Sequence, residues 1–367
     1  MDDVLAFLFP KTGPAIHPAV FGAIIVLGVV PGTVSFLVWC ERRISAWIQD
    51  RLGPNRVGPF GLLQSIADLV KFLFKEDVIP GHVNKPLYFL APILGVVPYM
   101  IVFAFLPFGE RLWVANVDTG ILAVFAFSSV AVYALALGGW ASNSKYPLIG
   151  GVRASAQMIS YELCLSLSAL GVFMMAGSLN LVEVVRAQAD GLHVGGELHD
   201  GMLAQIFDWN IWSQPVGALI FLVAGFAETN RLPFDMPEAE SELAAGYHTE
   251  YSSMKFALFF LGEYAAMIAI STLFATLYLG GWTLFGAEHL LNDVMADTAW
   301  ANQVITAVWH SLLLGGKVFT LLFLFIQVRW TLPRFRYDQL MTLGWRTLLP
   351  VSLLWVALSA VVYWMVR

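Results

Sequence analysis

The sequence predicts an all-α polytopic membrane protein, with about eight transmembrane helices and one amphipathic helix in the membrane interface. Two observations predict this fold class. The 367-residue chain is 58% hydrophobic and only 13% charged, and its mean hydropathy is +0.72. An ordinary soluble domain is excluded, because a surface that faces water needs a larger share of charged side chains. We expect residues 1–367 to form a single membrane domain.

Eight apolar runs are long enough to be transmembrane helices, because a helix needs about 20 apolar residues to cross the hydrocarbon core. They lie at about 17–40, 86–107, 117–140, 154–176, 211–228, 253–279, 304–328 and 347–366. The fifth run is the least regular, because it ends in the charged Glu228. The sequence shows no internal repeat, which disfavours an inverted-repeat transporter.

Basic residues are distributed unevenly between the connections. The first, third, fifth and seventh connections carry 14 Lys and Arg residues, whereas the second, fourth and sixth carry only Arg111 and Arg186. Short loops that are rich in Lys and Arg stay on the cytoplasmic side of the membrane. The pattern therefore predicts that the odd-numbered connections are cytoplasmic and that both termini are periplasmic.

The first connection contains a turn and an amphipathic segment. The run GPNRVGPFG, at residues 53–61, is rich in Gly and Pro, which predicts a defined turn. Residues 62–75 then place Leu, Ile and Val on one helical face and Gln, Asp and Lys on the other. This helix is too short and too charged to span, so we expect it to lie in the interface plane. It is either a surface anchor or a lateral wall for an amphiphilic substrate that enters from the bilayer.

The connection at about 228–252 is the most acidic part of the chain, and apolar runs flank it. It combines carboxylates with Arg231 and His248 and mixes them with Pro, Phe and Met. This composition predicts a packed polar inlet at the membrane surface rather than a solvated loop. Its acidic residues are Glu228, Asp235, Glu238, Glu240, Glu242 and Glu250.

Ionisable residues also lie inside predicted spans, where each costs about 2.5–3.5 kcal/mol on insertion scales. Among them are Glu162, Glu263 and Lys317. Each could form an internal hydrogen bond or ion pair, which is the interpretation we favour for Lys317. Glu228 lies three residues before Arg231, a helical spacing that suits an ion pair. Carboxylates on several separate spans favour a polar or proton path through the bundle.

The last cytoplasmic connection carries Arg329, Arg334 and Arg336, followed by Asp338. Arginines beside a membrane usually fix the topology or meet lipid headgroups. They could also bind a polar substrate head or an acidic partner surface. The sequence alone leaves both interpretations open.

Redox chemistry within this chain is not expected. The sequence holds only two cysteines, Cys40 and Cys164, whereas an iron–sulfur cluster or a structural zinc normally takes about four ligands. We therefore predict buried free thiols and no metal site. We also expect no catalytic residue in this chain.

Several runs, spread over nearly the whole chain, together resemble one known family. They are Glu41-Arg42-Arg43, GPNRVGPFGLLQ (Gly53–Gln64), Ala67-Asp68, Phe74-Lys75-Glu76-Asp77, Gly139-Trp140-Ala141-Ser142, Ser160-Tyr161-Glu162, Ala227–Tyr251, Gly280-Gly281-Trp282 and Arg336-Tyr337-Asp338-Gln339-Leu340. These runs resemble the H subunit of the bacterial proton-translocating NADH:quinone oxidoreductase (respiratory complex I), whose mitochondrial counterpart is subunit 1.

The resemblance implies a membrane-arm subunit that forms much of the quinone tunnel and links quinone reduction to proton translocation. The amphipathic helix would frame the tunnel entrance. The resemblance implies quinone contacts at Glu41, Arg42, Phe60, Asp68 and Arg336. It implies a proton relay through Glu162, Glu228, Asp235, Glu238, Glu240, Glu242 and Glu263.

The resemblance also implies partners, cofactors and location. We expect two hydrophilic quinone-site subunits, one of which carries the terminal iron–sulfur cluster, together with neighbouring small membrane subunits and lipid. Quinone would be the substrate, FMN and the iron–sulfur clusters would lie in partner subunits, and this chain would bind no cofactor and no nucleic acid. The location would be the inner membrane of a bacterial cell.

Three other functions are compatible with the sequence. One is the membrane anchor of a related hydrogenase or formate-hydrogenlyase complex, against which the intact GPNRVGPFGLLQ run and the complete acidic connection argue. Another is a standalone secondary transporter or channel, which the lack of repeats and the one-sided charge disfavour. The third is a passive anchor whose acids only dock partners.

Overall fold

The computed structural model describes residues 18–110, 112–189, 209–236, 245–284 and 299–366. Within these ranges the chain is helical and contains no strand. The long helices are α2 (Pro18–Ile48), α4 (Lys85–Phe105), α5 (Gly120–Ala141), α6 (Lys145–Ala176), α10 (Pro215–Glu228), α12 (Ser253–Tyr278), α14 (Ala299–Thr331) and α16 (Leu349–Val366). The short ones are η1 (Pro59–Gly61), α3 (Gln64–Phe74), α7 (Leu181–Ala189), α9 (Asn210–Ser213), η2 (Gly246–His248), α15 (Tyr337–Thr342) and the π-helical η3 (Leu343–Leu348).

The predicted all-α membrane fold is confirmed, and each of the predicted apolar runs contains a helix. Six of the described helical stretches are long and apolar enough to cross a membrane, and α10 is a shorter apolar helix. Several predicted boundaries were wrong. The first helix continues to Ile48 instead of ending near residue 40, and α6 begins at Lys145 instead of residue 154. Helix α14 begins at Ala299 instead of residue 304, and the short α9 precedes α10, which begins at Pro215 instead of residue 211.

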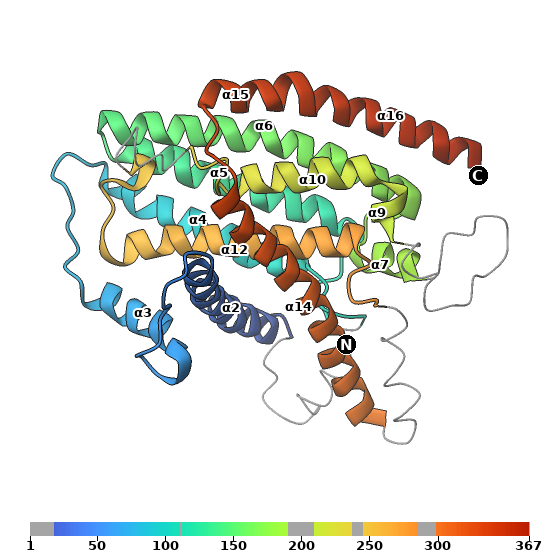
Figure 1. Ribbon diagram of the computed structural model, residues 1–367, viewed down its shortest axis with the longest axis horizontal. Helices are drawn as coiled ribbons and strands as arrows, with labels where there is room; N and C mark the ends of the chain where they lie inside the picture. Colours follow the sequence, from blue (N-terminus) through green and yellow to red (C-terminus); the bar gives the residue numbers. More distant parts are fainter. Residues whose placement is uncertain (1–17, 111, 190–208, 237–244, 285–298, 367) are drawn as a thin grey trace.

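The long helices form a layered bundle (Figure 1). Helices α4, α5, α6, α10 and α12 lie nearly parallel to one another, with α16 along the outer side of α6. Helices α2 and α14 cross this group at an angle. Helices α4 and α12 approach closely where two glycines meet, since a Cβ on Gly262 would lie 2.3 Å from the Gly95 carbonyl oxygen.

The connections separate to the two ends of the bundle as the charge pattern requires. At one end, the Asn84 amide donates to the Ala141 carbonyl at 3.0 Å, and the Phe335 amide donates to the Pro233 carbonyl at 3.2 Å. These bonds join the first connection to the third and the fifth to the seventh, and the Val78 amide joins the first to the fifth by donating to Ser252 Oγ at 3.0 Å. At the other end, the Ile121 amide donates to the Leu179 carbonyl at 3.4 Å, which joins the second and fourth.

The amphipathic helix α3 lies apart from the main group, beside α2 and the start of α12 (Figure 1). The turn before it depends on Gly61, which has a φ of +75° and whose Cβ would lie 2.2 Å from the Pro54 carbonyl oxygen. The apolar side chains of α3 remain exposed within this chain; Ile66 is 55% and Leu73 59% accessible. This geometry agrees with the predicted interfacial helix.

Candidate functional site

A group of buried charges lies where α2, α12, α14 and the connection after α10 meet, and we call it the arginine–glutamate cluster. It consists of Glu41, Arg231, Glu263, Tyr264 and Arg329. The Arg231 guanidinium lies 2.7 Å from Glu263 Oε1 and 3.2 Å from Glu41 Oε1. The same Glu41 oxygen also accepts from Arg329, and the Tyr264 ring faces the Arg231 guanidinium at 4.4 Å.

Burial makes these pairings strong. Arg231 is 9% and Glu41 6% accessible, so water screens their charges little. Burial by itself lowers the pKa of Arg231, but Glu263, Tyr264 and Glu41 raise it well above its usual value. Arg231 therefore remains a cation and fixes the positions of both carboxylates.

The connection after α10 directs Arg231 into the bundle. Helix α10 ends at Glu228, and Asn230 has a φ of +52°, so the chain turns away from the helix axis. Gln157 of α6 supports this turn, because its Nε2 lies 2.7 Å from the Ala227 carbonyl and 2.8 Å from the Phe234 carbonyl. The helical pairing expected between Glu228 and Arg231 therefore does not form, and Arg231 pairs with Glu41 and Glu263 instead.

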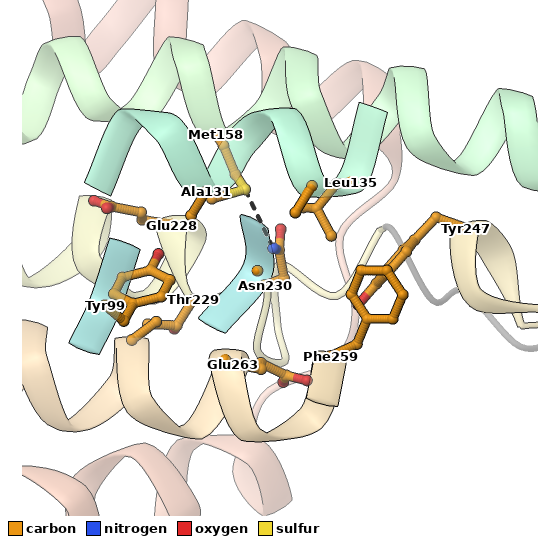
Figure 2. Close-up of a pocket in the computed structure, with 14 residues that line it drawn as sticks. Tyr99, Ala131, Leu135, Met158, Glu228, Thr229, Asn230, Tyr247, Phe259 and Glu263 are labelled. Carbon is orange, nitrogen blue, oxygen red and sulfur yellow. Dashed lines mark hydrogen bonds between the residues drawn. The ribbon is translucent and has the colours of Figure 1, made fainter. Parts of the chain in front are cut away.

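A narrow cavity of about 40 Å³ adjoins the cluster (Figure 2). Glu263 and Glu228 both line it, on different sides, and Asn230 lies between them. A second cavity of about 20 Å³ lies next to the first, and Tyr99 and Glu228 line both. A water molecule needs roughly 10–15 Å³ of this kind of space, so the two cavities have room for a short chain of waters.

Glu162 extends the series of carboxylates beyond the cavities. It accepts a hydrogen bond from Ser129 of α5, and the neighbouring Ser128 lines the second cavity together with Glu228. The carboxylates therefore form a series that starts at the end of the bundle with the odd-numbered connections, which we predict to be cytoplasmic, and leads into its interior. The order is Glu41, Glu263, Glu228 and Glu162.

A separate polar contact links α2 to the amphipathic helix. Arg42 Nη1 lies 2.5 Å from Asp68 Oδ2, and Gln64 Nε2 lies 3.3 Å from Asp68 Oδ1. The Arg42 and Asp68 side chains are 45% and 20% accessible. Phe60 is 73% accessible. Its carbonyl oxygen accepts a hydrogen bond from Trp39 Nε1 at 3.2 Å.

The remaining predicted residues divide into two groups. Asp235 pairs with Arg334 at 2.8 Å, and Arg336 pairs with its neighbour Asp338 at 2.8 Å on the exposed surface. The structure thus places Asp235 and Arg336 outside the two cavities. The other predicted relay residues, Glu238, Glu240 and Glu242, lie outside the described residues.

Sequence reasoning missed the uncharged members of the site, and it did not include Arg231 and Arg329 among the site residues. Tyr99, Ser129 and Gln157 sit in apolar helices, where a single polar residue gives little signal. Tyr264 adjoins Glu263 in the sequence, which could have drawn attention to it. The internal hydrogen bond that we favoured for Lys317 is confirmed, because its ammonium donates to the Leu279 and Thr283 carbonyls near the end of α12.

Comparison with known proteins identifies the family. The chain matches the NADH dehydrogenase family over residues 21–360. NADH-quinone oxidoreductase subunit 8 of Rhodothermus marinus is 49% identical over 338 residues, which cover 92% of this chain and 95% of that protein. The NADH-quinone oxidoreductase H subunit of Salinibacter ruber is 44% identical over 353 residues, which cover 95% of this chain and 98% of that protein. The second NADH-quinone oxidoreductase H subunit of Geobacter sulfurreducens is 47% identical, with 93% of this chain covered and 96% of that protein. This chain therefore belongs to the NADH dehydrogenase family, together with the H subunits of bacterial NADH-quinone oxidoreductases.

Proposed function

We propose that this chain is the membrane subunit of a bacterial NADH:quinone oxidoreductase that couples quinone reduction to proton translocation in the cell inner membrane. The observation that carries the proposal is the buried arginine–glutamate cluster beside a cavity that Glu228 and Glu263 line. Charges in the interior of a membrane bundle are costly, and they mark substrate or proton paths. The proposed reaction is taken from the relatives, which are named as subunits of NADH-quinone oxidoreductases.

In this proposal, the chain shapes the quinone channel and other subunits carry the electrons. Hydrophilic partners would hold FMN and the iron–sulfur clusters, and quinone would enter past α3. The Arg42–Asp68 pair lies between α2 and α3, so it suits the wall of a channel that an amphiphile enters from the bilayer. Phe60 and Arg336, both exposed, would contact quinone or its partner subunits at the same end.

Reduction of a quinone to a quinol takes up two electrons and two protons. The change in charge near Glu41 and Arg231 would shift the proton occupancy of Glu263 and Glu228. At an effective dielectric constant of 20, unit charges 4 Å apart interact by about 4 kcal/mol, which is enough to drive such a shift. The carboxylate series would then pass a proton, or a change of conformation, to neighbouring membrane subunits.

The proposal is tested by purification of the chain with an affinity tag from its native membrane. We expect it to co-purify with many unlike subunits, including iron–sulfur proteins, and the complex to oxidise NADH with quinone as acceptor. A homo-oligomer would indicate a transporter, and a complex that evolves hydrogen would indicate the related hydrogenase anchor. Either result would refute the proposal.

The Arg42–Asp68 pair gives a residue-level prediction. We expect Asp68→Asn to lower turnover with quinone by about fivefold, because Arg42 loses a charged partner and the channel wall is altered. The rate of NADH oxidation by ferricyanide, which takes electrons before the membrane arm, should stay unchanged. An equal fall in both rates would show that the variant disrupts the whole complex rather than the channel.

A further inference from the structure

The first turn of α12 binds the chain segment that leaves α3. Ser253 Oγ lies 2.8 Å from the Phe72 carbonyl oxygen and 3.0 Å from the Lys75 carbonyl oxygen. Ser252 Oγ accepts from the Val78 amide at 3.0 Å and lies 3.1 Å from the Val78 carbonyl oxygen. Two consecutive serines thus hold the C-terminal end of α3 and the residues that follow it.

An ion pair completes this contact. Lys255 Nζ lies 2.5 Å from both carboxylate oxygens of Asp77, and the Lys255 side chain is only 9% accessible. The ammonium also faces the rings of Tyr88 and Phe89 of α4, at 5.3 and 4.9 Å from their centroids. A buried lysine needs such partners, because burial of an uncompensated charge is costly.

The position of Lys255 is unfavourable for the helix itself. It is the third residue of α12, and the N-terminal turn of a helix carries partial positive charge that disfavours cations. Asp77, from the connection after α3, supplies the compensating negative charge. The lysine therefore contributes little to α12 alone, and its pairing serves to attach another segment.

The same junction also contacts the end of the acidic connection. The Tyr88 hydroxyl donates to the Glu250 carbonyl at 2.6 Å, and the Tyr88 ring stacks on Tyr251 at 4.2 Å. Lys255 thus lies where three parts of the chain meet: the end of α3, the start of α4 and the end of the acidic connection.

The opposite end of α3 is fixed independently. Ser65 Oγ donates to the Ser35 carbonyl of α2 at 2.7 Å, and Arg42 of α2 pairs with Asp68. Helix α3 is therefore held to α2 near its first turn and to α12 just beyond its last. Loss of the α12 contact would free one end while the other end stayed in place.

We propose that Lys255 is a positioning residue that, with Asp77, clamps the C-terminal end of α3 and so sets the path that a long quinone tail takes past this helix. The inference rests on the proposed function. A quinone with a long isoprenoid tail contacts the channel along its length, whereas a short-tailed analogue needs mainly the head-group site. The clamp should therefore affect long-tailed substrates selectively.

The test measures quinone kinetics of the purified complex with Lys255→Met. We expect the KM for a long-tailed quinone to rise about fivefold, with kcat and the KM for a short-tailed analogue within about twofold of the unmodified complex. Asp77→Asn, which changes a partly exposed side chain, should give the same selective rise. Lys255→Arg should restore the lower KM, because it keeps the charge.

Lys85→Met is the matched control, since Lys85 is an exposed lysine at the first residue of another long helix, α4. It should leave the KM for both quinones unchanged. The clamp is refuted if Lys255→Met and Asp77→Asn keep the original KM for the long-tailed quinone, or raise both KM values equally. If the Lys255→Met complex fails to assemble, the KM of Asp77→Asn for the long-tailed quinone decides by the same criterion. Absence of NADH:quinone activity in the unmodified complex would instead refute the proposed function.

Discussion

Replacement of Arg231 by Gln should reduce NADH:quinone turnover by about tenfold or more, because removing one member of a buried ion pair costs about 3–5 kcal/mol. Arg231 contacts Glu41 and Glu263 from a site that is 9% accessible. Without the guanidinium, the two carboxylates would face each other without a cation between them. Arg329 would still pair with Glu41, but Glu263 would lose its cationic partner in the cluster.

The measurement compares turnover with quinone, turnover with ferricyanide and the temperature at which the complex loses activity. We expect turnover with quinone to fall, turnover with ferricyanide to persist and the inactivation temperature to decrease. Arg231→Lys should have an intermediate effect, because an ammonium keeps the charge but lacks the planar fork that reaches two carboxylates.

Arg186→Gln provides the matched control for Arg231. Arg186 pairs with Glu110 at 3.7 Å, and both side chains are about half exposed (53% and 48%). Exposed pairs of this kind contribute only about 0–1 kcal/mol, so all three measurements should stay close to those of the unmodified complex. Normal quinone turnover in Arg231→Gln would show that the arginine–glutamate cluster is dispensable.

The sequence was most informative where hydrophobicity alone decides the structure. The apolar runs predicted the positions of the long helices, and the Gly-Pro turn and the period of residues 62–75 predicted α3. Boundaries at charged residues were harder to predict. Helix α2 continues through Glu41, Arg42 and Arg43, because Glu41 finds buried cationic partners on other elements that a local pattern does not reveal.

The pairings within the site were beyond the reach of local sequence reasoning. Arg231 and Glu41 are 190 residues apart, and Arg329 and Glu41 are 288 apart. The near neighbour of Arg231, Glu228, looked like its natural partner. The end of α10 at Glu228 and the turn at Asn230 separate the two side chains. Only the tertiary arrangement shows which carboxylates pair with Arg231.

Glu228→Gln should give the second large effect, a loss of about tenfold or more in quinone turnover and the accompanying proton translocation. Glu228 is 4% accessible and lines both cavities (Figure 2). It is therefore the carboxylate through which a chain of waters from Glu263 would reach the second cavity. Gln has nearly the same shape, so the packing should persist while the exchangeable proton is lost.

The experiment reconstitutes the complex in sealed vesicles and follows NADH oxidation and internal acidification together. Assembly and ferricyanide reduction should be normal in Glu228→Gln, which separates a relay defect from misfolding. Glu183→Gln, a change at an exposed residue near the other end of the bundle, should leave both rates unchanged. If Glu228→Gln reduced quinone and acidified the vesicles at the original rates, protons would have to bypass both cavities, and the carboxylate series from Glu41 to Glu162 would have only a structural role.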